Sequence, residues 1–327
     1  MRVLMVKTSS MGDILHSLPA LTDAILAFPN ICVEWVIEEE FIEIPSWHPA
    51  VNRVVPVAIR RWRKNWFSSL VRKEYIKFKN SIQLYPYDAI IDAQGLLKSA
   101  TLISRLAKGI KHGADIYSTR EPLASLWYDK RYSIPKTKHA LERTRILFAK
   151  SLNYDLPTIT GDYAIEQRFR KNLPLNTGKY TVCIHATTRW DKEWPEIEWR
   201  KLISFIQNTG LYVKLPWGND HERLRAQRLA QGFSHVEVLP KLTLEEIAYI
   251  LAGARAVVSV DTGLSHLAAA LNCPNITLYG PTNVTLIRTY GKNQIALFSL
   301  EKNMATLTAN KVQPFLRNLL YETASCD

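Results

Sequence analysis

A single aspartate, Asp13, lies between an apolar run and a helix-like segment near the start of the chain. Residues 3–6 are Val-Leu-Met-Val, as in a strand buried on both faces, and apolar residues then recur at helical spacing from Ile14 to Leu26. Open parallel sheets bind ligands at the carboxyl ends of their strands, where Asp13 is expected. Its carboxylate therefore serves either as an ordinary helix cap, the commoner role, or as a general base.

The segment Asp-Thr-Gly-Leu-Ser-His at 261–266 follows another buried apolar run, residues 256–260. Thr262 and Gly263 begin the next expected helix, where unpaired backbone N–H groups and the helix dipole favour a diphosphate. His266 lies one turn into that helix and has the chemistry to add a hydrogen bond or a positive charge, although a single histidine here is more often structural.

Other polar residues follow neighbouring expected strands of the second half. Thr187 and Thr188 offer two hydroxyl groups, and Lys192 offers an ammonium group. Glu222 comes just after a further strand end, where a carboxylate can accept both hydroxyls of a ribose. Each signal is weak alone, but together they indicate a nucleotide–diphosphate site at one edge of a sheet.

The chain has a formal net charge of +12, and much of the excess lies in residues 60–79. This segment combines eight basic side chains and one acid, Glu74, with interleaved aromatic residues. The aromatic residues are Trp62, Trp66, Phe67, Tyr75 and Phe78. Such a segment suits nucleic-acid phosphates, lipid headgroups or a phosphorylated substrate, and the plainer alternative is a solvated basic helix.

Composition predicts a globular, cytosolic protein. A chain of 327 residues suits two domains, no stretch reaches the ~20 apolar residues of a membrane span, and the start is a strand rather than a signal peptide. Four cysteines are scattered without metal-ligand spacing, so we expect reduced thiols. They are Cys32, Cys183, Cys273 and Cys326.

Strand-like and helix-like segments alternate in both halves, which predicts two doubly wound α/β domains of Rossmann type facing a central cleft. The second half includes a helix that Thr243 is expected to cap, with Glu246 at capping-box spacing. No GxGxxG, GxxxxGK[ST] or DxD pattern is present, so dinucleotide, P-loop and acidic metal-clamp sites lose their main support. The expected divisions are a first domain 1–155, a linker 156–178, a second domain 179–307 and a C-terminal helix 308–327.

Several segments together resemble the ADP-heptose:lipopolysaccharide heptosyltransferases, glycosyltransferase family 9. They are KTSSMGDILHSLPAL, DAQGLLKSA, HATTRWDKEWP, KLPWGNDHE and SVDTGLSHLAAAL followed by ITLYGPT. The resemblance covers nearly the whole chain. It implies a GT-B fold, an acceptor bound by the first domain and a sugar nucleotide by the second, inversion at the anomeric carbon, and no required metal or cofactor. It also implies that the C-terminal helix returns to the first domain.

Carried over residue by residue, the resemblance makes Asp13 the general base for the attacking hydroxyl of a Kdo sugar. The donor-binding residues it implies are Thr187, Thr188, Lys192, Glu222, Leu242, Asp261, Thr262, Gly263 and His266. The acceptor-binding residues it implies are Arg60, Arg61, Arg63, Lys64, Lys98 and Arg120. The sequence departs from the pattern in two places: Leu242 replaces an expected methionine, and Arg189-Trp190 replaces an expected acidic pair.

The function that the resemblance implies is transfer of L-glycero-D-manno-heptose from ADP-heptose to Kdo₂-lipid A, the first heptose of the lipopolysaccharide inner core. The basic segment would then hold acceptor carboxylates and phosphates at the anionic inner face of the cytoplasmic membrane, with its aromatic residues against the lipid interface. One alternative is a related enzyme acting on a later inner-core sugar. A remote alternative is a basic nucleic-acid-binding protein, although nucleic acid is not an expected partner.

Overall fold

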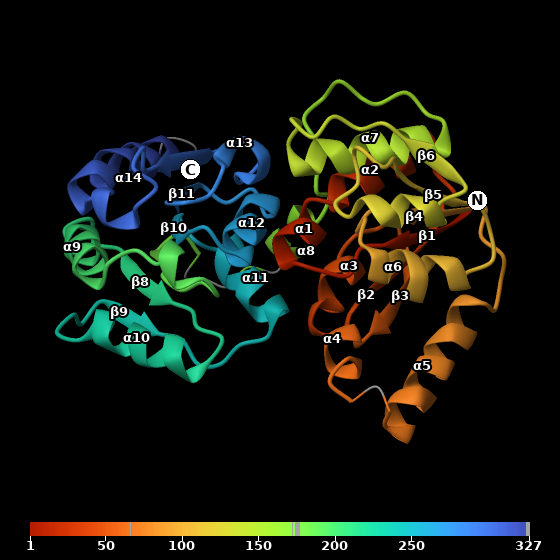
Figure 1. The fold of residues 1–327 in the computed structure, drawn as a ribbon. Helices are drawn as coiled ribbons and strands as arrows, with labels where there is room; N and C mark the ends of the chain where they lie inside the picture. The colour runs from red at the N-terminus through yellow and green to blue at the C-terminus, as the bar shows by residue number, and fades with distance from the viewer. Residues whose placement is uncertain (66, 172, 174–176, 325–327) are drawn as a thin grey trace. The chain divides into compact units, whose positions relative to one another are not determined.

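The computed structural model describes residues 1–65, 67–171, 173 and 177–324, so Trp66 and Cys326 lie outside the described residues (Figure 1). The chain forms two compact units, Met1–Ala164 and Ile165–Asp327. Their boundary falls within the predicted linker 156–178. The later part of that segment is packed, because helix α8 (Glu166–Arg170) buries Phe169 with its ring centroid 5.0 Å from that of Tyr249.

The first unit contains a six-stranded parallel sheet in the order β3-β2-β1-β4-β5-β6. The strands are β1 (Arg2–Val6), β2 (Cys32–Glu38), β3 (Val51–Val57), β4 (Ala89–Asp92), β5 (Lys111–Ala114) and β6 (Lys130–Tyr132). The strand order reverses between β1 and β4, which pair with Val6 opposite Asp92. Loops that leave such a switch point in opposite directions create the usual ligand crevice of a doubly wound sheet.

Short and long helices surround this first sheet. They are α1 (Met11–Leu15), α2 (Leu18–Ala27), α3 (Glu43–Ser46), α4 (Ile59–Trp62), α5 (Ser69–Ile82), α6 (Leu97–Leu102) and α7 (Ala140–Leu152), with 3₁₀ turns η1 (Glu39–Phe41), η2 (Ser104–Leu106) and η3 (Pro122–Trp127). Helices α2 and α7 lie side by side (Figure 1). Arg145 and Asp23 form a buried ion pair between them, with 2.6 Å from Nε to Oδ2. Removing either partner would leave an uncompensated buried charge, so this pair fixes the two helices together.

The second unit repeats the same topology. Its six parallel strands are ordered β12-β11-β10-β7-β8-β9, so the switch point lies between β7 and β10. The strands are β7 (Tyr180–Ile184), β8 (Tyr212–Leu215), β9 (Val236–Val238), β10 (Ala256–Val260), β11 (Asn275–Tyr279) and β12 (Gln294–Phe298). The predicted α/β fold class, with one Rossmann-like sheet in each half, is confirmed.

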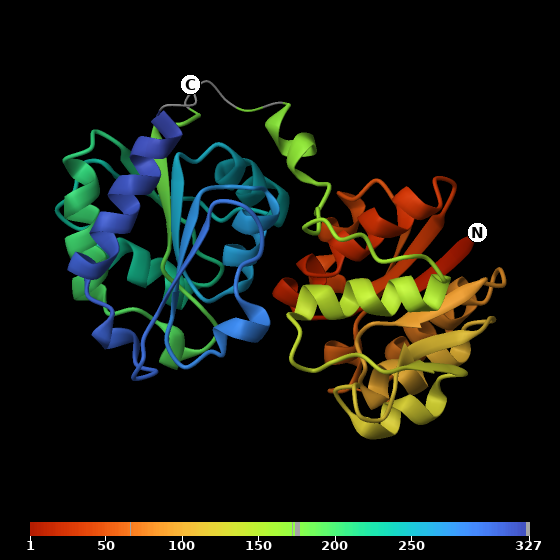
Figure 2. The same ribbon diagram turned by 90° about the horizontal axis from the view of Figure 1, so that it is seen from above.

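Helices cover both faces of the second sheet, which Figure 2 shows nearly edge-on. They are α9 (Glu196–Gln207), α10 (Asp220–Ala230), α11 (Leu244–Ala252), α12 (Gly263–Ala270), α13 (Val284–Ile287) and α14 (Ala309–Ala324), with 3₁₀ turns η4 (Trp190–Lys192) and η5 (Met304–Thr306). The predicted capping box of α11 is confirmed: Glu246 N donates to Thr243 Oγ1 at 3.2 Å, and Thr243 N donates to Glu246 Oε2 at 2.7 Å.

The C-terminal helix α14 differs from its expected role of returning to the first domain. It packs against α9 and β10 of its own unit. Val312, Leu316 and Leu319 belong to the same core as Trp194 and Trp199, whose ring centroids lie 4.9 Å apart. Since that face of the helix is buried in this core, we assign 308–324 to the second unit.

The three cysteines within the described part of the chain are free thiols, as predicted. Burial raises the pKa of both Cys183 and Cys273 to about 12, so these side chains act as small apolar groups. Among the described residues, no helix combines the length and apolar character needed to cross a bilayer.

Candidate active site

Asp13 lies in the first turn of α1, directly beyond the carboxyl end of β1. Its Oδ2 accepts hydrogen bonds from both the backbone N and the Oγ of Ser10, each at 3.2 Å. The other oxygen, Oδ1, lies 3.8 Å from the Nζ of Lys7, and about a third of the Asp13 side chain is exposed. The carboxylate therefore caps its helix and also presents an oxygen at the edge of the sheet, so the two predicted roles are compatible.

The surroundings of Asp13 keep it ionised. Burial by itself raises the pKa of the carboxyl group, but the charge of Lys7, the hydrogen bonds from Ser10 and the charge of Arg120 together lower that pKa below its usual value. The charge of Arg120, a residue predicted for the acceptor site, thus acts on Asp13. Lys7 was not identified from the sequence, and its Nζ is fixed by donating to Ala93 O at 3.1 Å.

The predicted basic cluster of the first unit is partly paired with acids. Arg60 Nη1 lies 2.6 Å from Glu40 Oε2, and Arg61 bridges Glu39 at 3.1 Å and Glu74 at 3.0 Å. All these side chains are about half exposed, and exposed ion pairs contribute little stability. Anionic ligand groups can therefore replace the glutamates at small cost.

Two further cations, Arg63 and Lys64, are exposed. Lys98 is the second residue of α6, and its charge, like that of Arg60, acts on the buried carboxyl group of Glu38. Glu38 ends β2, and its backbone N donates to Thr8 O in the loop after β1 at 3.2 Å. Lys98 and Arg60 thus belong to the same sheet edge as the loop that leads to Asp13.

The aromatic residues of segment 60–79 do not form the expected lipid-facing surface. Trp62 and Phe78 are buried, with ring centroids 6.1 Å apart, and Tyr75 is half-buried beside them. Trp62 Nε1 donates to Glu74 Oε2 at 2.6 Å. These rings pack α4 and α5 against the sheet, because an aromatic side chain contributes most when its apolar area is removed from water. Phe67 is the exposed exception, at 86%.

In the second unit the strongest polar cluster centres on Asp261, at the end of β10. The Nζ of Lys192 and the Oγ1 of Thr282 each donate to Asp261 Oδ2 at 2.6 Å. Thr187 Oγ1 donates to the backbone O of Asp261 at 3.3 Å. These contacts join the loops after β7 and β10 across the switch point, which brings together three residues predicted for the diphosphate. Thr282, from the sequence GPT, was not predicted.

The tip of helix α12 has the predicted form. Thr262 is its N-cap, Gly263 is its first residue, and Ser265 Oγ donates to Thr262 O at 2.6 Å. His266 is buried one turn into the helix. Thr188 is exposed on the loop after β7. An eight-residue helix whose first N–H groups point from the carboxyl edge of the sheet is suited to an anion.

Glu222 is used within its own loop rather than in the Asp261 cluster. Its Oε2 accepts from Gly218 N at 2.7 Å, and its Oε1 accepts from Asn219 Nδ2 at 2.9 Å. Leu242 is half-buried between β9 and α11. The unusual Arg189 forms an exposed ion pair with Asp191, and Trp190 is 86% exposed. Neither departure from the family pattern disturbs the Asp261 cluster.

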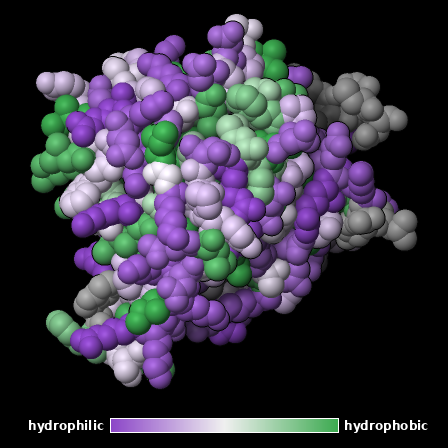
Figure 3. All heavy atoms as spheres, turned by 90° about the vertical axis from the view of Figure 1, so that its right-hand side faces the viewer, coloured by the Kyte–Doolittle hydropathy of each residue, from purple (hydrophilic) through white to green (hydrophobic). Residues whose placement is uncertain are grey.

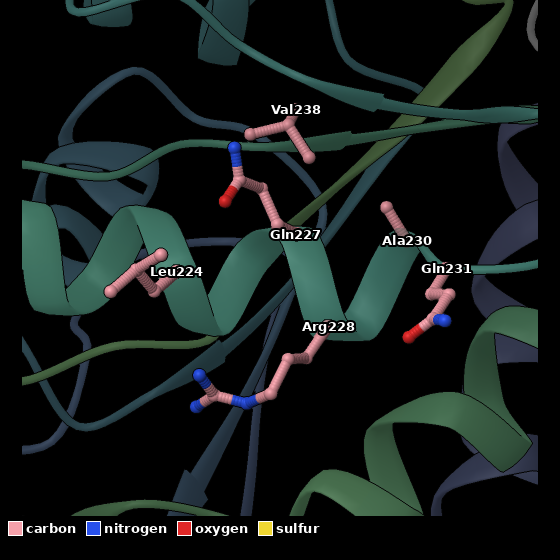
Figure 4. Close-up of a pocket in the computed structure, with 6 residues that line it drawn as sticks. All are labelled: Leu224, Gln227, Arg228, Ala230, Gln231 and Val238. Carbon is pink, nitrogen blue, oxygen red and sulfur yellow. The ribbon is translucent and has the colours of Figure 1, made fainter.

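A surface hollow lies on α10 and β9 (Figure 4), but the described residues that line it lack a polar cluster like the one around Asp261. Its only charged lining residue, Arg228, already binds Glu196 at 2.8 Å. Within the described ranges, no three or more His, Cys, Asp and Glu side chains gather closely enough to hold a metal ion.

Comparison with known proteins decides the family. The sequence profile of "Glycosyltransferase family 9 (heptosyltransferase)" matches residues 75–315. The chain belongs to glycosyltransferase family 9. A relative, lipopolysaccharide heptosyltransferase 1 of Escherichia coli O18:K1:H7, is 60% identical over 97% of both chains. Lipopolysaccharide heptosyltransferase 1 of Pseudomonas aeruginosa is 51% identical over 91% of this chain and 84% of the relative.

Solved structures of a heptosyltransferase support the fold. The chain is similar to the E. coli heptosyltransferase WaaC with ADP, at 59% identity, a TM-score of 0.95, and 98% and 100% coverage of the two chains. The same enzyme with ADP-2-deoxy-2-fluoro heptose gives 58% identity and a TM-score of 0.92 over 97% and 99% of the two chains. The protein is therefore a heptosyltransferase-type glycosyltransferase with the two-domain α/β fold called GT-B.

Proposed function

We propose that the enzyme transfers heptose from ADP-heptose to a Kdo sugar of Kdo₂-lipid A, with inversion at the anomeric carbon and Asp13 as the general base. The observation that carries the donor is the likeness, over 97% of the chain, to a heptosyltransferase solved with an ADP-heptose analogue. The relatives at 51–60% identity are named lipopolysaccharide heptosyltransferase 1, which favours the first heptose over a later one.

The second unit binds the donor in this proposal. The diphosphate lies against Thr187, Thr188, Lys192 and the first turn of α12, with Asp261 holding the lysine in place. Glu222 binds the ribose, Leu242 packs beside the adenine, and His266 supports the helix tip. As the glycosidic bond breaks, Lys192 offsets the negative charge that develops on ADP, which is the electrostatic role a metal ion has in other transferases. No metal or other cofactor is then required.

The first unit binds the acceptor and activates it. Asp13 accepts the proton of the attacking Kdo hydroxyl as its oxygen bonds to the anomeric carbon and ADP leaves from the opposite face. The acceptor's carboxylates and phosphates replace Glu39, Glu40 and Glu74 on the arginines, and the other acceptor cations join them. These cations are Arg60, Arg61, Arg63, Lys64, Lys98 and Arg120.

A comparison of two acceptors distinguishes an enzyme that adds the first heptose from one that acts on a later inner-core sugar. With ADP-heptose as donor, transfer to Kdo₂-lipid A should be fast, and transfer to the same lipid already carrying one heptose should be slow. The reverse preference would keep the donor site and move the enzyme to a later step. Binding of oligonucleotides with a steep salt dependence and no transfer would instead support the nucleic-acid alternative.

Replacing Arg60, Arg61 and Arg63 together by Ala should raise the KM for the acceptor roughly 10- to 100-fold. One hydrogen bond to a charged group contributes about 1.5–3 kcal/mol when buried, and each of these exposed side chains contributes less because water screens its charge. The KM for ADP-heptose should change little. The matched control removes three exposed lysines of the same unit, Lys108, Lys136 and Lys138. Equal effects in the two triple variants would mean that only net charge matters.

The outer face of α5 gives the enzyme a means of contact with an anionic membrane surface. Arg72, Lys73 and Lys77 are exposed on it, while the only acid of the helix, Glu74, turns toward Trp62 and Arg61. Exposed apolar side chains accompany these cations: Phe67, Leu70 and Ile76. The molecular face in Figure 3 is mostly hydrophilic with scattered hydrophobic groups. Such a surface suits attraction to anionic lipid at the inner face of the cytoplasmic membrane more than deep insertion.

Vesicle flotation tests this contact. The protein should float with phosphatidylglycerol vesicles at low salt and remain unbound with phosphatidylcholine vesicles. Changing Arg72, Lys73 and Lys77 to Gln should weaken binding roughly 100-fold, since each basic residue near an anionic surface contributes about 1 kcal/mol. The same change at Lys108, Lys136 and Lys138 is the control. Equal binding by both variants would remove α5 from the contact.

A further inference from the structure

We propose that Gln94, in the loop after β4, is a positioning residue for transfer: it fixes the backbone of the loop that carries Asp13. Gln94 is 4% exposed, so its side chain acts through the residues it binds. The inference rests on the proposed function of Asp13 and goes beyond it, because it assigns the residue that holds the base in place.

The topology brings the two loops together. Strands β1 and β4 are neighbours at the switch point of the first sheet (Figure 1). The backbone N groups of Ala93 and Gln94 both donate to Val6 O, at 3.0 and 3.1 Å. The loop after β4 therefore starts directly against the end of β1.

The side chain of Gln94 completes the connection. Its Oε1 accepts from Thr8 N at 2.9 Å, from Ser9 N at 3.2 Å and from Thr8 Oγ1 at 3.3 Å. Two backbone N–H donors require an acceptor at this point, so the amide oxygen, not the nitrogen, must face the loop. Ser10 follows directly and binds both its N and its Oγ to Asp13. The amide oxygen of Gln94 thus fixes the backbone of Thr8 and Ser9, and the next residue, Ser10, binds the carboxylate of Asp13.

Gln94 is itself rigidly held. Asp92, which is 2% exposed, accepts at Oδ1 from Gln94 N at 3.0 Å and from Gly95 N at 3.1 Å. Gly95 has φ +64°, and a Cβ there would lie 2.8 Å from Thr119 Oγ1, next to Arg120. The loop between β4 and α6 is therefore a fixed support. It also supplies Ala93 O, which binds the Nζ of Lys7 beside Asp13.

Two substitutions of Gln94 separate positioning from bulk stability. Gln94→Leu removes the acceptor and leaves buried N–H groups unpaired, so the loop should shift and kcat should fall roughly 10- to 100-fold. The affinity for ADP, which the second unit binds, should stay unchanged. The stoichiometry of ADP binding gives the number of folded molecules, by which kcat is normalised. Gln94→Glu keeps an oxygen acceptor and should restore most of kcat. Its added negative charge should move the acid limb of the kcat–pH profile upward by raising the pKa of Asp13.

Gln83→Leu is the control, since the Gln83 side chain likewise binds a distant loop of the first unit, donating from Nε2 to Leu106 O at 2.8 Å in a part-buried hydrogen bond away from the Asp13 loop. Unchanged kcat per ADP-binding molecule in Gln94→Leu, or equal losses in Gln94→Leu and Gln83→Leu, would overturn the inference. So would a kcat–pH profile in Gln94→Glu identical to the wild type. If instead Asp13→Asn transferred heptose normally, the proposed base itself would fail, whatever Gln94 does.

Discussion

Replacing Asp13 by Asn should reduce kcat by roughly 10²- to 10⁴-fold, the usual loss when a general base is removed. Asn has nearly the same shape and can still accept from Ser10, so the cap of α1 survives, but it cannot take a proton. The affinity for ADP should not change, because every donor contact proposed here belongs to the second unit. Single-turnover transfer and ADP titration measure the two quantities.

The wild-type pH profile gives an independent check of Asp13. Because Lys7, Ser10 and Arg120 outweigh the effect of burial and lower the pKa of the carboxyl group, the acid limb of kcat should lie below the ordinary Asp value. Lys7→Met should move that limb upward. A normal rate in Asp13→Asn, or a loss confined to thermal stability, would leave Asp13 with its capping role alone.

The Lys192→Ala variant should bind ADP roughly 10- to 150-fold more weakly, since a charge-assisted hydrogen bond contributes about 1.5–3 kcal/mol. It should also lose kcat by roughly 10²- to 10³-fold, because the same ammonium group offsets charge on the leaving ADP. Isothermal titration and steady-state kinetics with saturating donor separate the two losses.

The matched control for Lys192 is Lys201→Ala. Lys201 also binds a carboxylate, that of Glu198, at 2.7 Å in the second unit, but its side chain is 52% exposed. This variant should have normal kinetics. If Lys192→Ala bound ADP and turned over like Lys201→Ala, the contact with Asp261 would be purely structural.

The fold was predictable where strands are buried on both faces. Continuous apolar runs such as residues 3–6 and 256–260 belong to β1 and β10, the strands beside the two switch points. The short strands β5 and β6, with sequences KHGA and KRY, carry no such signal because lysine, histidine and arginine occupy most of their positions. Their pairing is set by neighbours distant in sequence, which a local pattern does not contain.

The site was predictable to the extent that its residues follow strands. Asp13, Lys192 and Asp261 were candidates from the sequence because the strand exits within one doubly wound sheet converge. Lys7 and Gln94 were missed because their roles depend on a hydrogen bond to a loop some 85 residues away in sequence. The sequence DAQG was the available signal for Gln94, a polar segment at another strand exit of the same sheet.

The charge of segment 60–79 was visible in the sequence, but its pairing was not. Glu40 pairs with Arg60, and Glu39 pairs with Arg61. These residues are about 20 positions apart in the sequence and meet because the ends of β2 and β3 are adjacent in the sheet. The aromatic residues were misassigned for a related reason: helical spacing places Tyr75 and Phe78 toward the core side of α5, where they pack with Trp62.

The metal-free, inverting transfer proposed for this enzyme is tested by single-turnover transfer from ADP-heptose to Kdo₂-lipid A in the presence of EDTA, with the anomeric configuration of the product determined by NMR. We expect complete transfer without divalent metal, and a product whose anomeric configuration is opposite to that of the donor. Retained configuration would contradict direct attack by an acceptor activated by Asp13, and transfer that stops in EDTA would contradict the role given to Lys192.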